Sequence, residues 1–125
     1  MAGFFYRQSD EEREHALKFA EFLVEAGAKV AVPAIEPPRA DIGSADAALK
    51  LSVEWEMEVT RQINAPLDRA FQEKVRMAVG LLNWFVGEQL EEVSSVEGPL
   101  AVVRRAGPNG LLFVEDFLAR RGAKS

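Results

Sequence analysis

The chain has 125 residues, of which 48% are hydrophobic and 28% charged, a composition typical of one folded globular domain. The chain has 20 Asp and Glu residues and 15 Lys and Arg residues, so its net charge is −5. This charge gives no indication of a basic surface for a nucleic-acid partner. Cysteine is absent and His15 is the single histidine. This excludes disulfides, thiolate-bound clusters and metal sites that need two histidines from one chain.

The ends and the interior of the sequence carry no targeting or membrane signal. The N-terminus lacks the apolar stretch of a signal peptide, and no apolar run approaches the ~18 residues that a membrane span requires. We therefore expect one domain over residues 1–125, located in the cytoplasm, without a membrane or nucleic-acid partner.

The first predicted helix covers residues 4–26 and ends at Gly27, a residue type that commonly terminates helices. Its apolar side chains recur at helical spacing and share one stripe with polar residues. The stripe consists of Phe5, Gln8, Glu12, His15, Phe19, Phe22 and Ala26.

The following residues, 27–43, are too rich in Pro for a helix and predict a long extended crossover. Ser44 is a suitable N-cap for a second helix, which Pro66 should kink. No Gly, Asn or Asp marks where this helix ends between residues 72 and 77. Its inward stripe contains Leu49, Val53, Glu56, Val59, Ile63, Leu67 and Ala70.

A third helical stripe contains Ala78, Leu82, Phe85, Gln89, Glu92, Val96 and Val103. Gly98 and Pro99 should interrupt or bend this helix. After the turn sequence G-P-N-G, residues 111–120 predict a short amphipathic helix. Because no segment alternates with the period of two that is typical of strands, the predicted fold class is all-α.

Polar residues interrupt all three long stripes. The interruptions are Glu12 and His15 in the first, Glu56 in the second, and Gln89 and Glu92 in the third. A carboxylate that faces a helical core costs several kcal/mol unless it is paired, protonated or bound to a metal. Three helices with inward carboxylates therefore suggest one shared cation site, and oxygen ligands with a single imidazole suit iron or manganese.

Each of these residues also has an ordinary structural interpretation. Ser9 and Glu12 have the spacing of a capping box, which would place Glu12 at the start of a helix. A single histidine on an amphipathic helix is more often structural than a ligand. Glu56 lies in the acidic run E-W-E-M-E, and Gln89 and Glu92 lie in E-Q-L-E-E, which are typical of solvated faces. The coincidence of three interrupted stripes favours the metal site.

Four blocks of the chain resemble bacterial non-haem ferritin, in the family's order and at compatible spacing. They are D-E-E-R-E-H-A-L-K-F, V-P-A-I-E-P-P, W-E-M-E-V-T-R-Q-I-N and N-W-F-V-G-E-Q-L-E-E. The likeness continues through G-P-N-G-L-L-F to the last helix, so it covers nearly the whole chain. It implies a ferritin-like helical bundle, a class in which inward Glu and Glu-x-x-His residues build di-iron sites.

The resemblance also implies a role for each inward residue. Glu12 would bridge two irons, His15 would bind the first iron, and Glu56 and Glu92 would hold the second, with Gln89 beside it. Gln-x-x-Glu in place of a second Glu-x-x-His points away from haem-containing relatives, so no haem is expected. An outer iron site would comprise Glu11, Glu88 and Glu91.

The chain departs from the family at its N-terminus. Ferritins of this type begin with a further long helix that supplies another glutamate, whereas Met1 falls where the second family helix begins. We therefore expect a truncated bundle, with three long helices, a short C-terminal helix and an uncovered apolar groove. Another copy, a separate helix-donating chain or collapse of the remaining helices would fill that groove. The expected assembly is a homo-oligomer, either a 24-subunit cage or a smaller one.

Two functions are consistent with these features. In the first, the protein is a ferroxidase that oxidises Fe(II) to Fe(III) at a di-iron centre and stores ferric mineral in a cage. In the second, it is a non-catalytic ferritin-like subunit or fragment that co-assembles with other chains. Ferroxidase activity is expected where another chain completes the site.

Overall fold

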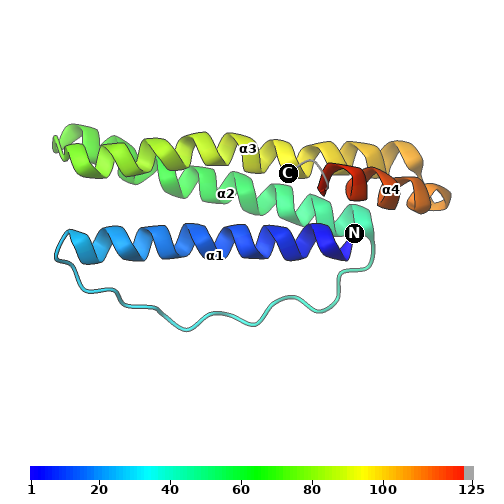
Figure 1. The fold of residues 1–125 in the computed structure, drawn as a ribbon, viewed down its shortest axis with the longest axis horizontal. Coiled ribbons are helices and arrows are strands. Elements are labelled where there is room, and N and C mark those ends of the chain that lie inside the picture. Colours follow the sequence, from blue (N-terminus) through cyan, green and yellow to red (C-terminus); the bar gives the residue numbers. More distant parts are fainter. Residues whose placement is uncertain (123–125) are drawn as a thin grey trace. The chain divides into compact units, whose positions relative to one another are not determined.

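The computed structural model describes residues 1–122, which are helical apart from their connecting segments and contain no strand (Figure 1). The all-α prediction is therefore confirmed. The chain divides into two compact units, Met1–Ala40 with the chain from Glu115 onward, and Asp41–Val114. The helices are α1 (Ala2–Glu25), α2 (Ala45–Gln72), α3 (Arg76–Ala106) and α4 (Leu111–Gly122), with the short 3₁₀ turn η1 (Pro108–Gly110) before α4.

The start of α2 is fixed by its N-cap. Ser44 adopts an extended conformation, and its Oγ accepts a hydrogen bond of 3.1 Å from the backbone N–H of Ala47. This satisfies one of the N–H groups that the first turn of a helix leaves without a helical partner. Asp46 adds a negative charge in the same turn, where the helix dipole favours it. The predicted cap is confirmed, and the helix continues through the exposed Pro66.

The connection between α2 and α3 is made without glycine. Lys74 adopts the left-handed conformation, with φ of 57°, and the N–H of Val75 donates to the carbonyl of Ala70 at 2.9 Å. That bond satisfies a carbonyl at the end of α2 and reverses the chain within three residues. A sequence search for Gly or Asn misses this turn because a lysine occupies the left-handed position. The result is an antiparallel hairpin in which α2 and α3 lie side by side (Figure 1).

The hairpin contains most of the buried apolar side chains among the described residues, and they follow the predicted stripes of both helices. Phe85, Leu49 and Val96 are among the most completely buried, and their packing removes apolar surface from water, the main favourable term in folding. The buried apolar positions on the two helices are Leu49, Ile63, Leu67, Ala70, Leu82, Phe85, Val96, Leu100 and Val103.

Helix α3 runs without interruption through Pro99, contrary to one of the two outcomes expected for this position. Proline removes a single N–H from the helical ladder, and the ring of Pro99 is almost fully buried, so apolar burial offsets part of that loss. The helix ends at Gly107, which has φ of 66°. The chain then turns tightly, so that Gly110 lies close to Ala106. A Cβ placed on Gly110 would lie only 2.7 Å from the Cβ of Ala106.

The first unit contains α1 and the connection that follows it. None of the 24 residues of α1 is buried, although one side of the helix is half-buried. The helix begins at Ala2 and passes through Ser9, so the capping-box interpretation of Glu12 is wrong. Gly27 ends the helix with φ of 77°, and residues 28–44 form neither helix nor strand, as the predicted crossover requires.

Helix α4 starts at the predicted residue and continues to Gly122. Val114 and Leu118 are buried, whereas Leu112 and Phe113 are among the most exposed apolar side chains of the described chain. The N-terminal ammonium of Met1 is paired with the carboxylate of Glu115. Within residues 1–122, no helix combines the length and the apolar character needed to span a membrane.

Candidate metal centre

Three polar side chains are buried in the α2–α3 hairpin. Glu56 is 8% exposed, Gln89 3% and Glu92 6%, and these three are the buried polar or charged side chains in the described part of the chain. The helical repeat explains their positions, because Glu56 follows Leu49 by two turns and Gln89 precedes Glu92 by three residues on one face of α3. The hairpin thus holds two carboxylates and one amide where apolar residues would otherwise lie.

Gln89 connects the two helices through its amide nitrogen. Its Nε2 donates to the backbone carbonyl of Glu56 at 3.1 Å, to Oε2 of Glu56 at 3.2 Å and to Oγ1 of Thr60 at 3.2 Å. The structure therefore brings two of the sequence-predicted residues into direct contact. Because the amide is buried, these bonds fix its orientation more firmly than they would at the surface.

Thr60 is a member of this cluster that sequence reasoning missed. Its hydroxyl donates to the carbonyl of Glu56, four residues earlier, at 2.8 Å. A threonine or serine inside a helix commonly donates to the carbonyl one turn before it. The spacing of Glu56 and Thr60 in W-E-M-E-V-T was therefore an available signal, although the sequence gives no sign that Gln89 would reach the same hydroxyl.

The acidic run around Glu56 divides into a buried and a solvated part. Glu54 is exposed and lies 3.9 Å from the ammonium of Lys50. Glu58 accepts hydrogen bonds from Arg61 and Gln62, and these bonds, led by the one from Arg61, lower the pKa of Glu58 from 4.5 to about 2. The solvated-face interpretation therefore describes Glu54 and Glu58 but is wrong for Glu56.

Helix α1 carries the other two predicted inner residues. Glu12 and His15 are three residues apart, with 3.9 Å between a carboxylate oxygen of Glu12 and Nδ1 of His15. The Glu12 side chain is 49% exposed and the His15 side chain 13%. This pair can offer one oxygen and one nitrogen ligand, but its carboxylate is far more accessible to water than those of the hairpin.

The three residues of the expected outer site are more exposed than those of the hairpin cluster. Glu11 is exposed and accepts a hydrogen bond of 3.1 Å from Nε2 of Gln8. On α3, Glu91 is exposed and Glu88 is half-buried. Exposed carboxylates are common without a metal, so the outer site remains a prediction.

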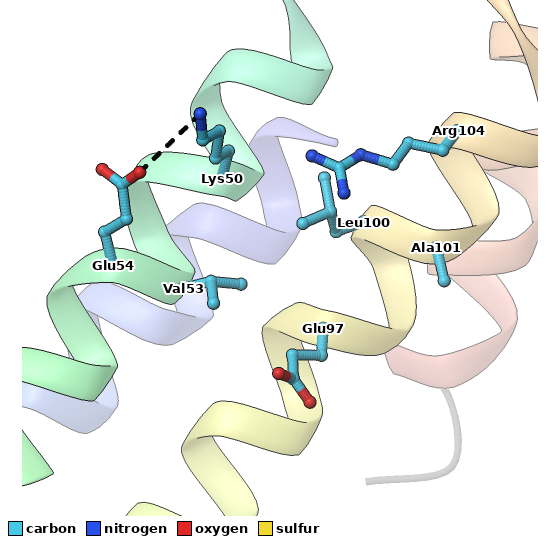
Figure 2. A pocket seen from close by; sticks show the side chains of 7 residues that line it. All are labelled: Lys50, Val53, Glu54, Glu97, Leu100, Ala101 and Arg104. Atoms are coloured by element: carbon cyan, nitrogen blue, oxygen red, sulfur yellow. Dashed lines mark ion pairs between the residues drawn. The ribbon is translucent and has the colours of Figure 1, made fainter.

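A groove of about 520 Å³ lies elsewhere on the hairpin, between α2 and α3 (Figure 2). Its wall mixes both charges, since Lys50 pairs with Glu54 and Arg104 pairs with Asp46 at 2.8 Å. None of the candidate metal ligands lines it, so the groove is separate from the centre. The lining residues are Lys50, Val53, Glu54, Glu97, Leu100, Ala101 and Arg104.

Comparison with known proteins gives a consistent result. Residues 1–106 match the family described as the ferritin-like domain. The chain is 34% identical over 120 residues to Ferritin BfrB of Mycolicibacterium smegmatis, a match that covers 96% of this chain and 66% of that protein. It is also 34% identical over 122 residues to bacterial non-heme ferritin of Staphylococcus aureus, covering 96% of this chain and 74% of the relative.

Solved structures show the same likeness. An open pore ferritin from the hyperthermophilic archaeon Archaeoglobus fulgidus superposes with a TM-score of 0.88 at 33% identity, over 92% of this chain and 72% of that chain. An engineered closed form of the Archaeoglobus fulgidus ferritin gives 0.82 at 34% identity, over 87% and 68%. The chain thus spans about two thirds to three quarters of the length of these relatives.

Proposed function

Because this chain belongs to the family of ferritin-like domains, we propose that it binds Fe(II), promotes its oxidation and takes part in storing the ferric product. The observation that carries the proposal is the buried cluster of Glu56, Gln89 and Glu92 in the α2–α3 hairpin. Buried carboxylates are costly in a metal-free core, and a cation bound between them compensates that cost. Anionic oxygen ligands also favour Fe(III) over Fe(II).

The resemblance to ferritins adds the pair on α1 to this proposal. By that resemblance Glu12 would bridge two irons and His15 would bind the first, while Glu56 and Glu92 would hold the second, with Gln89 beside it. Two Fe(II) ions held together each lose one electron to O2 or peroxide, and the protein holds them in place. Iron is the substrate here, and Glu11, Glu88 and Glu91 would form part of an outer iron site close by.

The assembly is part of the same proposal. The chain forms a homo-oligomer in the cytoplasm, a 24-subunit cage or a smaller one, in which ferric mineral accumulates. Two observations support this assembly. The relatives are named as ferritins, and apolar side chains, including Leu112 and Phe113, are exposed on α4.

A second function is favoured by one observation. None of the residues of α1 is buried, and the Glu12 side chain is 49% exposed. A non-catalytic ferritin-like subunit that co-assembles with other chains would bury such side chains against them.

Stopped-flow oxidation of Fe(II) by the full chain tests the proposal. We expect Glu56→Ala to remove the rapid phase, because it deletes a direct Fe–O bond, with a loss of at least ~10-fold. Glu54→Ala is the matched control, since it removes an exposed carboxylate two residues away on the same helix. Equal rates in the two variants would reject the carboxylate site. A chain without a rapid phase that co-elutes with a longer ferritin in size-exclusion chromatography would favour the non-catalytic, co-assembling subunit.

A further inference from the structure

Thr60 has a role in the hairpin beyond its hydrogen bond to a carbonyl of its own helix. It lies one turn after Glu56 on α2, and its hydroxyl has two partners. It donates its hydrogen to the carbonyl of Glu56 at 2.8 Å and accepts a hydrogen bond from Nε2 of Gln89 at 3.2 Å. One hydroxyl therefore links a candidate ligand on α2 with the amide that projects from α3.

The partners of Gln89 decide which edge of its amide faces α2. The backbone carbonyl of Glu56 can only accept, and Oε2 of the Glu56 carboxyl group accepts from Nε2 in this structure. The hydroxyl of Thr60 has used its hydrogen on the Glu56 carbonyl, so it also presents a lone pair to Gln89. A half-turn of the amide would place Oε1 against three oxygen atoms. The N–H₂ group of Gln89 is therefore oriented toward α2.

The consequence concerns the opposite edge of the amide. Oε1 of Gln89 makes no hydrogen bond within the described residues, and the side chain is only 3% exposed. A carbonyl oxygen of this kind is a neutral ligand or acceptor, whereas an N–H₂ group is neither. We propose that Thr60 is a positioning residue that fixes the Gln89 amide so that Oε1, rather than Nε2, is presented to the iron bound by Glu56 and Glu92.

This inference rests on the proposed carboxylate site and adds to it a direction for Gln89. It predicts that Gln89 acts toward the metal as an oxygen donor and not as a hydrogen-bond donor to bound oxygen species. Thr60 itself does not touch the ion. Removing its hydroxyl leaves Nε2 with one acceptor fewer and the Glu56 carbonyl with one donor fewer, in a place where water has little access.

The experiment compares two threonine variants by Co(II) titration, with Co(II) as a spectroscopic substitute for Fe(II). Thr60→Val keeps the shape and removes the hydroxyl, whereas Thr60→Ser keeps the hydroxyl. We expect Thr60→Val to weaken Co(II) binding about 10-fold, within the ~10–100-fold range for groups that orient ligands, and to change the visible absorption bands. Thr60→Ser should retain both the affinity and the bands of the natural chain.

Ser52→Ala is the matched control for a purely helical role. The hydroxyl of Ser52 donates to the carbonyl of Ala48 at 3.1 Å on the same helix, and it has no bond to Gln89. If the Thr60 hydroxyl served only its own helix, Ser52→Ala and Thr60→Val would have similar effects on Co(II) binding. That similarity, or an unchanged Thr60→Val spectrum, would overturn the inference.

A metal-free measurement separates this inference from the proposed function. Thermal unfolding of Thr60→Val, Gln89→Leu and the double variant tests whether the two side chains are coupled. We expect the double variant to lose less stability than the sum of the single losses, because each single change already breaks the shared bond. Additive losses would overturn the positioning role. Failure of the natural chain to bind Co(II), with the coupling present, would instead reject the proposed metal site.

Discussion

The α2–α3 hairpin and helix α1 are both amphipathic in sequence, yet they differ sharply in structure. The hairpin buries apolar residues from end to end and encloses three polar side chains among them. Helix α1 has no buried residue along its whole length. A stripe of apolar residues thus predicts which face of a helix is apolar, but it does not predict how completely each residue of that face is buried.

The same contrast applies to the candidate centre. Glu56 and Gln89 are held in a buried hydrogen-bonded arrangement, whereas nearly half of the Glu12 side chain is open to water. A ligand already fixed by its neighbours loses little freedom when a metal binds, and a mobile one loses more. Of the proposed ligands, Glu56 is therefore the one that the hydrogen bond to Gln89 preorganises, whereas Glu12 is the more exposed one.

The largest expected effect is on the core of the hairpin. Phe85→Ala removes a side chain that is 2% exposed and should lower the free energy of unfolding by ~3–5 kcal/mol. Leu17→Ala on α1, where the side chain is 52% exposed, should change it by less than ~0.5 kcal/mol. Denaturant unfolding measures both. Phe85→Leu provides a milder variant in case the alanine variant does not fold, and equal losses at Phe85 and Leu17 would contradict the comparison.

A second test examines how closely the end of the hairpin is packed. Gly110→Ala should destabilise the protein by ~1–3 kcal/mol, because the new Cβ would lie 2.7 Å from Ala106. Gly80→Ala has no atom within 4 Å of the new Cβ and lies inside α3, so it should stabilise the helix by ~0.5–1 kcal/mol. Melting temperatures that change in the same direction for both variants would contradict a destabilising clash between the new Cβ at position 110 and Ala106.

A third test concerns the buried carboxylate of α3. Glu92→Gln keeps the size of the side chain and removes an anionic oxygen ligand, so the Co(II) affinity should fall by at least ~10-fold. Glu97→Gln is the control, because it changes an exposed carboxylate on the same helix and should leave the affinity unchanged. Equal Co(II) affinities of the two variants would argue against Glu92 as a ligand.

The smallest effect concerns the surface of α2 and its dependence on pH. The bonds from Arg61 and Gln62 hold the pKa of Glu58 near 2, below its ordinary 4.5. The stabilisation they provide is therefore present above about pH 4.5 and is lost as the pH falls toward 2. Glu58→Gln should flatten this part of the stability profile in acid titrations followed by circular dichroism. An unaltered acid limb in that variant would mean that solvent screens the Arg61 bond completely.

Much of the fold could be predicted from local chemistry. The Ser44 cap, the Gly27 stop and the start of the last helix at Leu111 follow from residue type and periodicity, and the structure has all three. The family resemblance is confirmed by the match of residues 1–106. The turn at Lys74 could not be predicted, because a lysine takes the left-handed conformation only when the surrounding packing compensates its strain.

The candidate site, like the fold, could be predicted only in part from the sequence. Interruption of an apolar stripe marks Glu56, Gln89 and Glu92, and all three are buried. Periodicity cannot reveal how the amide of Gln89 is oriented, since that depends on a hydroxyl 29 residues away on another helix. The metal-binding roles of these residues, and of Glu12 and His15 with them, remain predictions for the titrations described above.

The proline in the middle of the α3 sequence has a consequence for how that helix opens. Because Pro99 has no N–H, the carbonyl of Ser95 lacks its usual helical donor, and the ladder of hydrogen bonds is divided at this point. Amide protons after Pro99 can therefore exchange with solvent through local fraying that stops before Glu92. The helix would behave as two cooperative segments. The segment between Pro99 and Gly107 would unfold locally, and the segment that contains Gln89 and Glu92 would remain helical.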